Sequence, residues 1–330
     1  MIKAYVTREG RLTQADEMTQ RNSWVNLVAP GEQEVAAVAS ALDIPADFLT
    51  AALDAEEQPR VEVDGQRVLL LLRCPVVRPD PSLTRYETLP LAVIVTPAHL
   101  VTVCLEPNEI VAQLVQQPSV HTAKRTLFVL QVLYRTAAQF LRYLRQIDRR
   151  TDEIERALHQ SLKNEELIKL LELAKSLVYF TTSLRANQIV MDKLMRLHLR
   201  SDSPTNGATA NDATITPPAV LKLYDEDREL LEDVITENRQ AIEMADIYSN
   251  ILSGMMDAFA SVISNNLNMV MKFLTSVTIV LALPTIVASL YGMNVPLPMQ
   301  ESPVAFWGVL VSIALLSGAA AWWLARRRMF

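Results

Sequence analysis

Residues 281–296 read LALPTIVASLYGMNVP, and this stretch decides the fold. It closes a segment, 273–292, that has no charged residue over 20 positions. A helix of that length spans about 30 Å, which matches the hydrocarbon core of a bilayer. The segment nevertheless contains Pro284 and several small hydroxyl residues, and it stops at Tyr291 and Gly292. These interruptions indicate a membrane helix that does more than anchor the chain.

A second uncharged segment follows at 304–325 and is also long enough to cross a membrane. The alternative is a buried hairpin in the core of a soluble protein. Two such segments in succession argue against that alternative. So do the tryptophans near the segment ends, Trp307, Trp322 and Trp323, which stand where an interfacial aromatic belt would lie. We therefore predict two transmembrane helices.

Basic residues set the expected orientation of these helices. Lys272 precedes the first segment, and a tail, 326–330, follows the second and contains Arg326, Arg327 and Arg328. The connecting loop, 293–303, has no Lys or Arg, so the positive-inside rule places this loop outside and both termini in the cytoplasm. We expect a multi-pass protein of the cytoplasmic (inner) membrane, in contact with lipids. The basic residues either raise an electrostatic barrier as a ring at the cytoplasmic mouth or serve topology and headgroup contact.

The first 118 residues predict a cytoplasmic α/β domain. The stretch RVEVDGQRVLLLLRCPVV reads as a hairpin that turns at Asp64 and Gly65, and a second pair of strands flanks Thr96 and Pro97. Short amphipathic helices fit residues 31–42 and 45–55.

From residue 119 the sequence becomes helical. Apolar residues at helical spacing predict two long helices, about 120–160 and 164–200, in a cytoplasmic hairpin over 119–200. Residues 201–218 are polar and contain prolines, as in a flexible loop. A third helix starts near Ala219 and forms a stalk, 219–272, that continues into the first membrane segment. The fold class is therefore an α+β cytoplasmic domain followed by a long helical stalk and two transmembrane helices.

Composition excludes several functions. The net charge of −6 and the pI near 5.4 argue against nucleic-acid binding. The chain has eight glycines and no phosphate-binding loop, and its histidines match no metal-ligand spacing, so we expect no enzyme. Cys74 and Cys104 are expected to pack as small hydrophobic side chains in a reducing compartment.

The first membrane segment and the stalk before it share a polar stripe. Its members recur at spacings of 4, 3, 4, 3, 4, 3 and 4, which keeps them on one face of a supercoiled helix. They are Ser264, Asn268, Met271, Thr275, Thr278, Ala282, Thr285 and Ser289. Such a stripe serves either close helix packing or the wall of a water-filled pore, and both require several copies of the chain. Pro284 leaves the carbonyl of Val280 without its helical partner, which is tolerable beside water or neighbouring helices.

The residues Tyr291, Gly292, Met293 and Asn294 end the charge-free segment, just before a short loop and a second segment. In this setting the chain resembles the CorA magnesium channels, whose signature is Gly-Met-Asn at the outer end of the first of two membrane helices. The stretches SWVNLVAP, EEQPRVEV and YETLPLAVIVT resemble the cytoplasmic domain of the family. Related proteins with Gly-Val-Asn are associated with zinc, so Co²⁺, Ni²⁺ and Zn²⁺ stay open as alternative ions.

The resemblance implies a funnel-shaped homopentamer that takes up Mg²⁺ passively and is gated by cytosolic Mg²⁺. Oxygens of Asn294 and the carbonyl of Gly292 would hold the hydrated ion, because Mg²⁺ loses its water reluctantly and uncharged oxygens accept hydrogen bonds from that water. Asn268 would form a polar ring at the cytosolic end of the pore, and Met271 and Leu274 would form its hydrophobic constriction. Ala282 departs from the family, which has a bulky methionine there.

The stalk is rich in acidic residues, most of which fit a solvated helix face. The resemblance implies that Asp233 is a regulatory Mg²⁺ ligand between neighbouring copies and that Asp257 belongs to a second acidic site. The partner of Asp233 is either Asp80 or Glu87 of a neighbour. A membrane-anchored structural or sensor protein without ion flux would explain the two helices but not the stripe.

Overall fold

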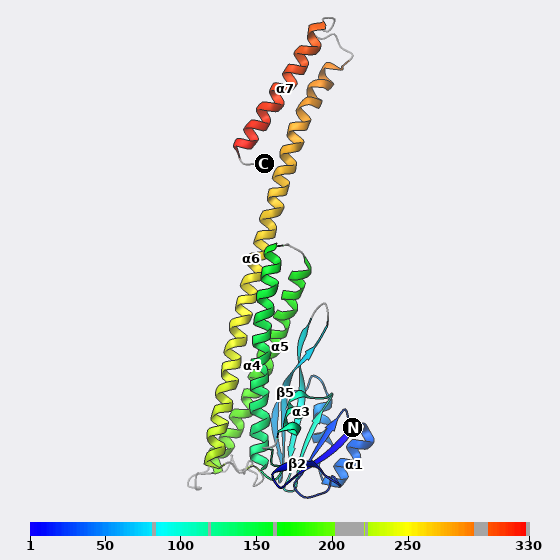
Figure 1. Cartoon of the computed structure of the whole chain (residues 1–330), viewed down its shortest axis with the longest axis vertical. Coiled ribbons are helices and arrows are strands. Elements are labelled where there is room, and N and C mark those ends of the chain that lie inside the picture. The colour runs from blue at the N-terminus through cyan, green and yellow to red at the C-terminus, as the bar shows by residue number, and fades with distance from the viewer. Residues whose placement is uncertain are drawn as a thin grey trace, which may run out of the picture. The chain divides into compact units, whose positions relative to one another are not determined.

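The computed structural model describes residues 1–80, 84–117, 120–160, 164–201, 221, 224–293 and 303–327. The chain divides into two compact units, Met1–Ser253 and Gly254–Phe330, and helix α6 belongs to both (Figure 1).

The first unit is built on a seven-stranded sheet with the order β2-β1-β3-β7-β6-β5-β4. All neighbouring strands are antiparallel except β3 and β7, which are parallel. The strands are β1 (Ile2–Arg8), β2 (Arg11–Gln14), β3 (Ser23–Val28), β4 (Arg60–Asp64), β5 (Arg67–Arg78), β6 (Arg85–Val95) and β7 (His99–Cys104). The predicted turns at Asp64–Gly65 and Thr96–Pro97 are confirmed, because β4 pairs with β5 and β6 with β7 across them.

The sheet is covered on both faces, which explains the unbroken apolar run of β5. Leu69 and Leu71 pack against α1 (Glu32–Leu42), α2 (Ala46–Thr50) and the short 3₁₀ turn η1 (Ala51–Leu53). Leu70 and Leu72 join the core on the other face, which α3 (Glu109–Gln116), α4 (Arg125–Gln160) and α5 (Asn164–Ser201) complete. Alternate side chains of one strand thus enter two separate cores.

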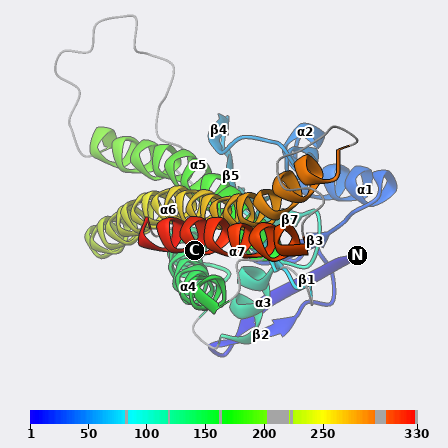
Figure 2. The ribbon, with the colours of Figure 1, turned by 90° about the horizontal axis from the view of Figure 1, so that it is seen from above.

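Polar contacts fix the long helices in this unit. Asn187 of α5 accepts a hydrogen bond from the backbone N–H of Arg73 (2.9 Å) and donates one to its carbonyl oxygen (2.8 Å). Asn238 of α6 donates to the carbonyl oxygen of Leu184 (3.1 Å), and Arg185 pairs with Asp246 (2.8 Å). These contacts tie α5 to the sheet and α6 to α5 (Figure 2).

Helix α6 (Asp225–Tyr291) begins later than the predicted start near Ala219. The carboxylate of Asp227 accepts a hydrogen bond from the backbone N–H of Tyr224 (3.1 Å), and the N–H of Arg228 donates to the Tyr224 carbonyl oxygen (3.0 Å). The side chain of Asp227 thus caps the free backbone N–H at the start of the helix, and the second bond is the first backbone bond of the helix itself. Most of the predicted loop, 202–218, lies outside the described residues.

The second unit contains the C-terminal part of α6 and helix α7 (Pro303–Arg326), which run side by side (Figures 1 and 2). Along α6 the covered side chains lie on one face: Ser276 is fully buried, and Val280, Leu283 and Val287 are half-buried. On α7 the corresponding covered positions include Ile313 and Leu324. We infer that α7 covers this face of α6.

Candidate functional site: the uncovered stripe of α6

The predicted stripe lies entirely on α6, and all of its side chains are exposed. All eight members lie in the second unit: Ser264, Asn268, Met271, Thr275, Thr278, Ala282, Thr285 and Ser289. At about 100° per residue, the membrane part of the stripe lies on the side of α6 opposite the face that α7 covers. The second helix of the same chain therefore does not pack on the stripe. Lys272 and Leu274 on this stretch are exposed as well.

Thr278 and Thr285 of the stripe use their hydroxyl hydrogens within the helix. The Oγ1 atom of Thr278 donates to the carbonyl oxygen of Leu274 (2.8 Å), and that of Thr285 donates to the carbonyl oxygen of Leu281 (3.1 Å). A hydroxyl bonded in this way keeps its oxygen lone pairs for outside donors. The stripe consequently presents hydrogen-bond acceptors to whatever lies beside it.

Pro284 does not break α6, which continues as a helix through this position to Tyr291. Because proline has no N–H, the carbonyl of Val280 lacks its usual backbone donor four residues later. Val280 lies one turn before the proline, and it is half-buried on the face that α7 covers rather than on the stripe. That its carbonyl oxygen lies beside neighbouring helices or water stays a prediction.

The helix ends at the signature motif. The backbone N–H of Gly292 still donates to the carbonyl oxygen of Ala288 (2.9 Å), and that of Met293 donates to Leu290 (3.4 Å). A Cβ atom at position 292 would lie 3.2 Å from the Ala288 carbonyl oxygen, which is tighter than ordinary contact. Glycine thus suits this position, while Asn294 lies outside the described residues.

The predicted regulatory acids, Asp233 and Asp257, both lie on α6 with exposed side chains. Within the part of the chain that the structure describes, no three His, Cys, Asp or Glu side chains gather as a metal site. Of the two candidate partners, Glu87 pairs with Arg78 in its own chain (3.4 Å). The expectation of a regulatory site between copies stays a prediction.

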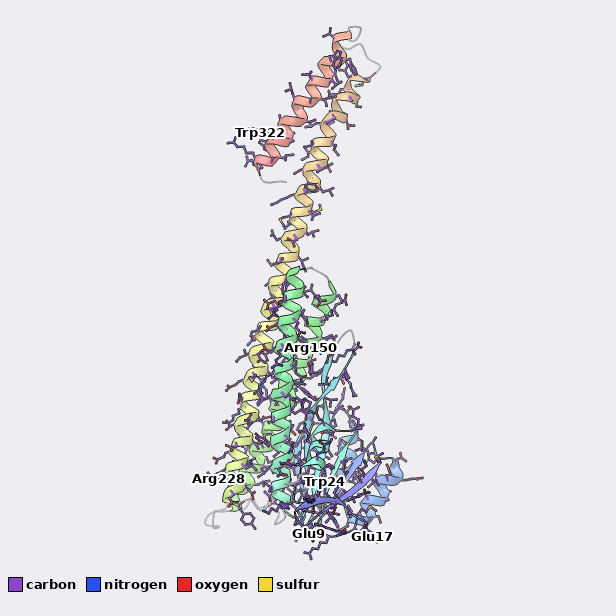
Figure 3. All side chains as sticks on the ribbon, viewed as in Figure 1. Glu9, Glu17, Trp24, Arg150, Arg228 and Trp322 are labelled. Atoms are coloured by element: carbon purple, nitrogen blue, oxygen red, sulfur yellow. The ribbon has the colours of Figure 1, made fainter. Side chains whose placement is uncertain are left out.

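Among the described residues, two helices are long and apolar enough to cross a membrane, and almost none of the most apolar stretch of either helix is buried. This exposure disagrees with a hairpin in a soluble core, whose side chains would be covered. At the end of α7, the guanidinium of Arg326 lies 5.4 Å from the ring centre of Trp322, and that of Arg327 lies 5.6 Å from that of Trp323. Figure 3 shows Trp322 projecting from the last turns of α7. Arg328 lies outside the described residues.

A family model described as "CorA-like Mg2+ transporter protein" matches residues 19–327. The chain belongs to this CorA-like family. The family consists of transporters, so the prediction that the chain is not an enzyme is confirmed. The match also confirms the resemblance that the Gly-Met-Asn stretch indicated.

Individual relatives agree with this assignment. The chain is 27% identical over 315 residues to the "Cobalt/magnesium transport protein CorA" of Methanocaldococcus jannaschii, covering 93% of this chain and 91% of that protein. The complete structure of the CorA magnesium transporter from the same organism matches with a TM-score of 0.76 and 25% identity, covering 98% and 96% of the two chains. The full-length CmaX protein shares the fold, with a TM-score of 0.66 and 16% identity over 99% and 97% of the chains. These matches confirm the predicted fold class, with its N-terminal α/β domain, long helix and C-terminal apolar helix.

The cysteines and the buried histidine of this CorA-like chain are structural. Cys74 and Cys104 are free and buried, as predicted, and burial raises their thiol pKa values to about 12 and about 11. His99 is buried with its Nδ1 atom 3.0 Å from the Ser23 hydroxyl, and burial lowers its pKa. These groups are held in uncharged forms in the core.

A polar cluster that was not predicted from the sequence surrounds Glu109 at the start of α3. The carboxylate of Glu109 accepts hydrogen bonds from Tyr143 (2.6 Å), Gln139 (2.9 Å), Arg142 (3.0 Å) and Gln113 (3.2 Å). Three of these donors lie at least 30 residues away along the chain. Spacing within one helix cannot reveal such a cluster, because it depends on how α3 packs on α4.

Proposed function

We propose that this CorA-like chain forms a membrane channel that carries divalent cations, and Mg²⁺ in particular, passively into the cytoplasm. The observation that carries the proposal is the polar stripe of α6, which is fully exposed and lies opposite α7. A hydroxylic face toward lipid would be costly, so the stripe requires either water or other copies of the chain. Divalent cation transport is also what the name of the M. jannaschii relative states for that protein.

Several copies are needed to enclose a path. One helix cannot surround water, and α7 lies on the wrong side of α6 to contribute a wall. A cyclic assembly that turns every stripe toward a common axis is the simplest arrangement. The number five, and hence the homopentamer, comes from the resemblance to the family. In that arrangement α7 would face lipid outside the ring of α6 helices.

The stripe suits a hydrated cation. First-shell waters of Mg²⁺ donate hydrogen bonds, and the back-bonded hydroxyls of Thr278 and Thr285 present acceptors to them. At the outer mouth, Asn294 and the Gly292 carbonyl would form a ring of uncharged oxygens. Such a ring binds weakly enough for the ion to leave again, as conduction requires.

Gating is assigned to the cytosolic end of the stripe. Met271 and Leu274 would form hydrophobic rings that close the path by excluding water, and Asn268 a polar ring beside them. Ala282 is small and exposed, so this chain has no bulky ring at that level, and closure would depend on Met271 and Leu274.

Cytosolic Mg²⁺ is the proposed regulatory ligand. Exposed carboxylates such as Asp233 and Asp257, repeated around a symmetry axis, repel one another unless cations bind between the copies. Mg²⁺ bound there would hold the copies together in a closed state, and its loss would release them. Asp80 or Glu87 of a neighbour would complete the site at Asp233.

The orientation follows from charge at the membrane surface. Lys272 and the arginines Arg326, Arg327 and Arg328 would lie at the cytoplasmic headgroups, where the tryptophans stacked against Arg326 and Arg327 also belong. The loop 293–303 would then lie outside, at the entrance of the pore. Both termini would be cytoplasmic.

A second candidate ion is Co²⁺, because the M. jannaschii relative is named for both cobalt and magnesium. Ni²⁺ and Zn²⁺ have a size and charge similar to those of Mg²⁺ and Co²⁺, so they are the other two ions whose flux should be compared. All four ions would use the same oxygen-lined path.

Ion uptake into vesicles that contain the purified full-length protein tests the proposal. A Mg²⁺-sensitive dye inside the vesicles should report flux under an inward Mg²⁺ gradient, without an added energy source. Parallel measurements with Co²⁺, Ni²⁺ and Zn²⁺ rank the ions, and empty vesicles give the background. Zn²⁺ flux without Mg²⁺ flux would overturn the assignment to Mg²⁺. A complete absence of flux for all four ions would overturn the proposal that the chain forms a channel.

A further inference from the structure

The first unit contains a cavity of about 360 Å³ between α3, α4 and the start of α6. Figures 1 and 2 both show α3 beside α4. Most residues that line the cavity are polar and four of them are glutamines, although much of the lining surface is apolar. The residues are Gln113, Gln117, Gln131, Tyr134, Arg135, Ala138, Gln139, Arg142 and Leu230. The volume falls in the range of small-molecule sites in proteins.

Among the described residues, Arg135 in the cavity lining has no carboxylate partner. Arg142 pairs with Glu109 at 3.0 Å, and the remaining acceptor capacity of Glu109 is taken up by the neutral donors described above. Arg135 has a different partner: its Nη1 atom donates to the neutral amide oxygen of Gln113 (3.1 Å). Burial lowers the pKa of the Arg135 guanidinium, as expected for a partly desolvated cation without an anionic partner.

Several buried polar atoms of the lining have no hydrogen-bond partner among the described residues, and they include Nε of Arg135, Oε1 of Gln131 and Oε1 of Gln139. Gln139 is 5% exposed, and its Nε2 atom donates to Glu109 and to the Tyr143 hydroxyl. The side-chain amide therefore cannot flip to find a donor for its Oε1 atom without losing both of these hydrogen bonds. A buried donor or acceptor that is left unpaired is costly, roughly 1–3 kcal/mol each. One donor and two acceptors therefore await partners in the same cavity.

We propose that this cavity binds a small organic anion that also carries O–H or N–H groups. The anionic group would accept hydrogen bonds from Arg135, which supplies both the unbalanced charge and the free Nε donor. The O–H or N–H groups of the ligand would donate to the side-chain oxygens of Gln131 and Gln139. Its carbon skeleton would lie against Leu230 and the ring of Tyr134.

This site is separate from the proposed ion path. It needs an anion rather than a cation, and its lining comes from the first unit, whereas the stripe lies in the second. Binding can be measured without any ion flux, so the site and the proposed function can fail independently. Leu230 belongs to α6, the helix that also carries the stripe, and so the ligand would contact that helix directly.

Calorimetric titration of the full-length protein in detergent, at one fixed Mg²⁺ concentration, tests the proposal with two matched probes. Glycerol phosphate and propyl phosphate have the same anionic group and chain length, but only the first carries hydroxyl donors. Saturable binding of one glycerol phosphate per chain is expected, about tenfold tighter than propyl phosphate, because two hydrogen bonds to the glutamine oxygens are lost in the second probe.

Two variants and one control locate the site. Arg135→Gln should weaken both probes at least about tenfold, because a charge-assisted hydrogen bond is lost. Gln131→Leu keeps the guanidinium and should shrink the preference for glycerol phosphate, so it tests the same site even where Arg135→Gln does not fold. Arg149→Gln removes an equal charge from an exposed position of α4 and should leave both affinities unchanged.

Specific results would overturn the proposal. These are no saturable binding of glycerol phosphate by the intact protein, equal affinity for the two probes, or the same loss in Arg149→Gln as in Arg135→Gln. A change in the number of assembled copies in Arg135→Gln, without probe binding by the unmodified protein, would also overturn it. That last result would show that a second copy of the chain covers the cavity instead.

Discussion

The hydroxyl of Thr278 donates a 2.8 Å hydrogen bond to the carbonyl oxygen of Leu274, one turn earlier on α6. This bond occupies the only hydrogen that the Thr278 side chain can donate. The exposed oxygen is left as an acceptor on the face opposite α7. Such a group interacts well with the waters of a hydrated cation and poorly with lipid.

Thr278→Val replaces this hydroxyl with a methyl group of nearly the same shape. Flux of Mg²⁺ into vesicles should fall about fivefold, because the hydrated ion loses accepting hydrogen bonds that we take to be worth ~1 kcal/mol in total at this level of the path. Ile279→Val is the matched control, since Ile279 is exposed on a different side of the helix. Equal flux through both variants would favour close packing between copies over a pore wall.

Asn294→Ala removes the uncharged side-chain oxygen that we assign to the outer mouth. Mg²⁺ flux should be abolished, because the ring would lose the acceptors that hold the hydrated ion. The assembly, measured by size-exclusion chromatography with light scattering, should stay intact. Retained flux would remove Asn294 from the ion path.

Asp233→Lys places a positive charge at the proposed regulatory site. Internal Mg²⁺ should inhibit flux less, with the half-inhibitory concentration raised at least about tenfold, because an anionic ligand is replaced by a charge that repels the cation. Glu243→Lys makes the same charge change at another exposed position of α6 and should respond to Mg²⁺ as the unmodified protein does. An unaltered response in Asp233→Lys would reject this residue as a sensor.

Asn187→Ala should destabilise the first unit by about 2–4 kcal/mol, because two partly buried backbone groups of Arg73 lose their partners at once. Chemical unfolding of the full chain in detergent, followed by tryptophan fluorescence, measures the change, since Trp24 is buried in that unit. The exposed Asn250→Ala is the control and should change the free energy of unfolding by less than about 0.5 kcal/mol. A similar loss in both variants would contradict the assigned role.

Ionisation of Tyr143 should lower the stability of the folded protein at alkaline pH. Burial and the hydrogen bond to Glu109 raise its pKa to about 12, against 10.0 for an ordinary tyrosine. The folded state thus holds this proton more tightly than the unfolded state. The resulting stabilisation is complete below pH 10 and is lost as the pH rises toward 12. Thermal unfolding between these values should show a shallower decline in Tyr143→Phe than in the exposed control Tyr179→Phe, and equal slopes would contradict this origin.

Local sequence signals predicted much of the first unit. The strand pairs around Asp64–Gly65 and Thr96–Pro97 could be predicted because each turn joins two strands that are neighbours in the sequence and in the sheet. Strands β1 and β2 were missed because β2 is a four-residue edge strand with mostly exposed side chains and β1 is mostly half-buried, so neither shows a strong alternating pattern. The parallel pairing of β3 with β7 joins segments about 76 residues apart, and no turn motif announces such a contact.

Sequence alone determined that this chain has two helices able to cross a membrane and a polar stripe along the first of them. Length, charge and periodicity are properties of a single helix, and they need no partner to be recognised. Only the tertiary structure decided that α7 covers the opposite face and leaves Thr278 and its neighbours exposed. It also decided that Arg135 faces a cavity without a carboxylate, while Glu109 is saturated by other donors. Both outcomes depend on which distant side chains pack together, and that information is not local to any one segment.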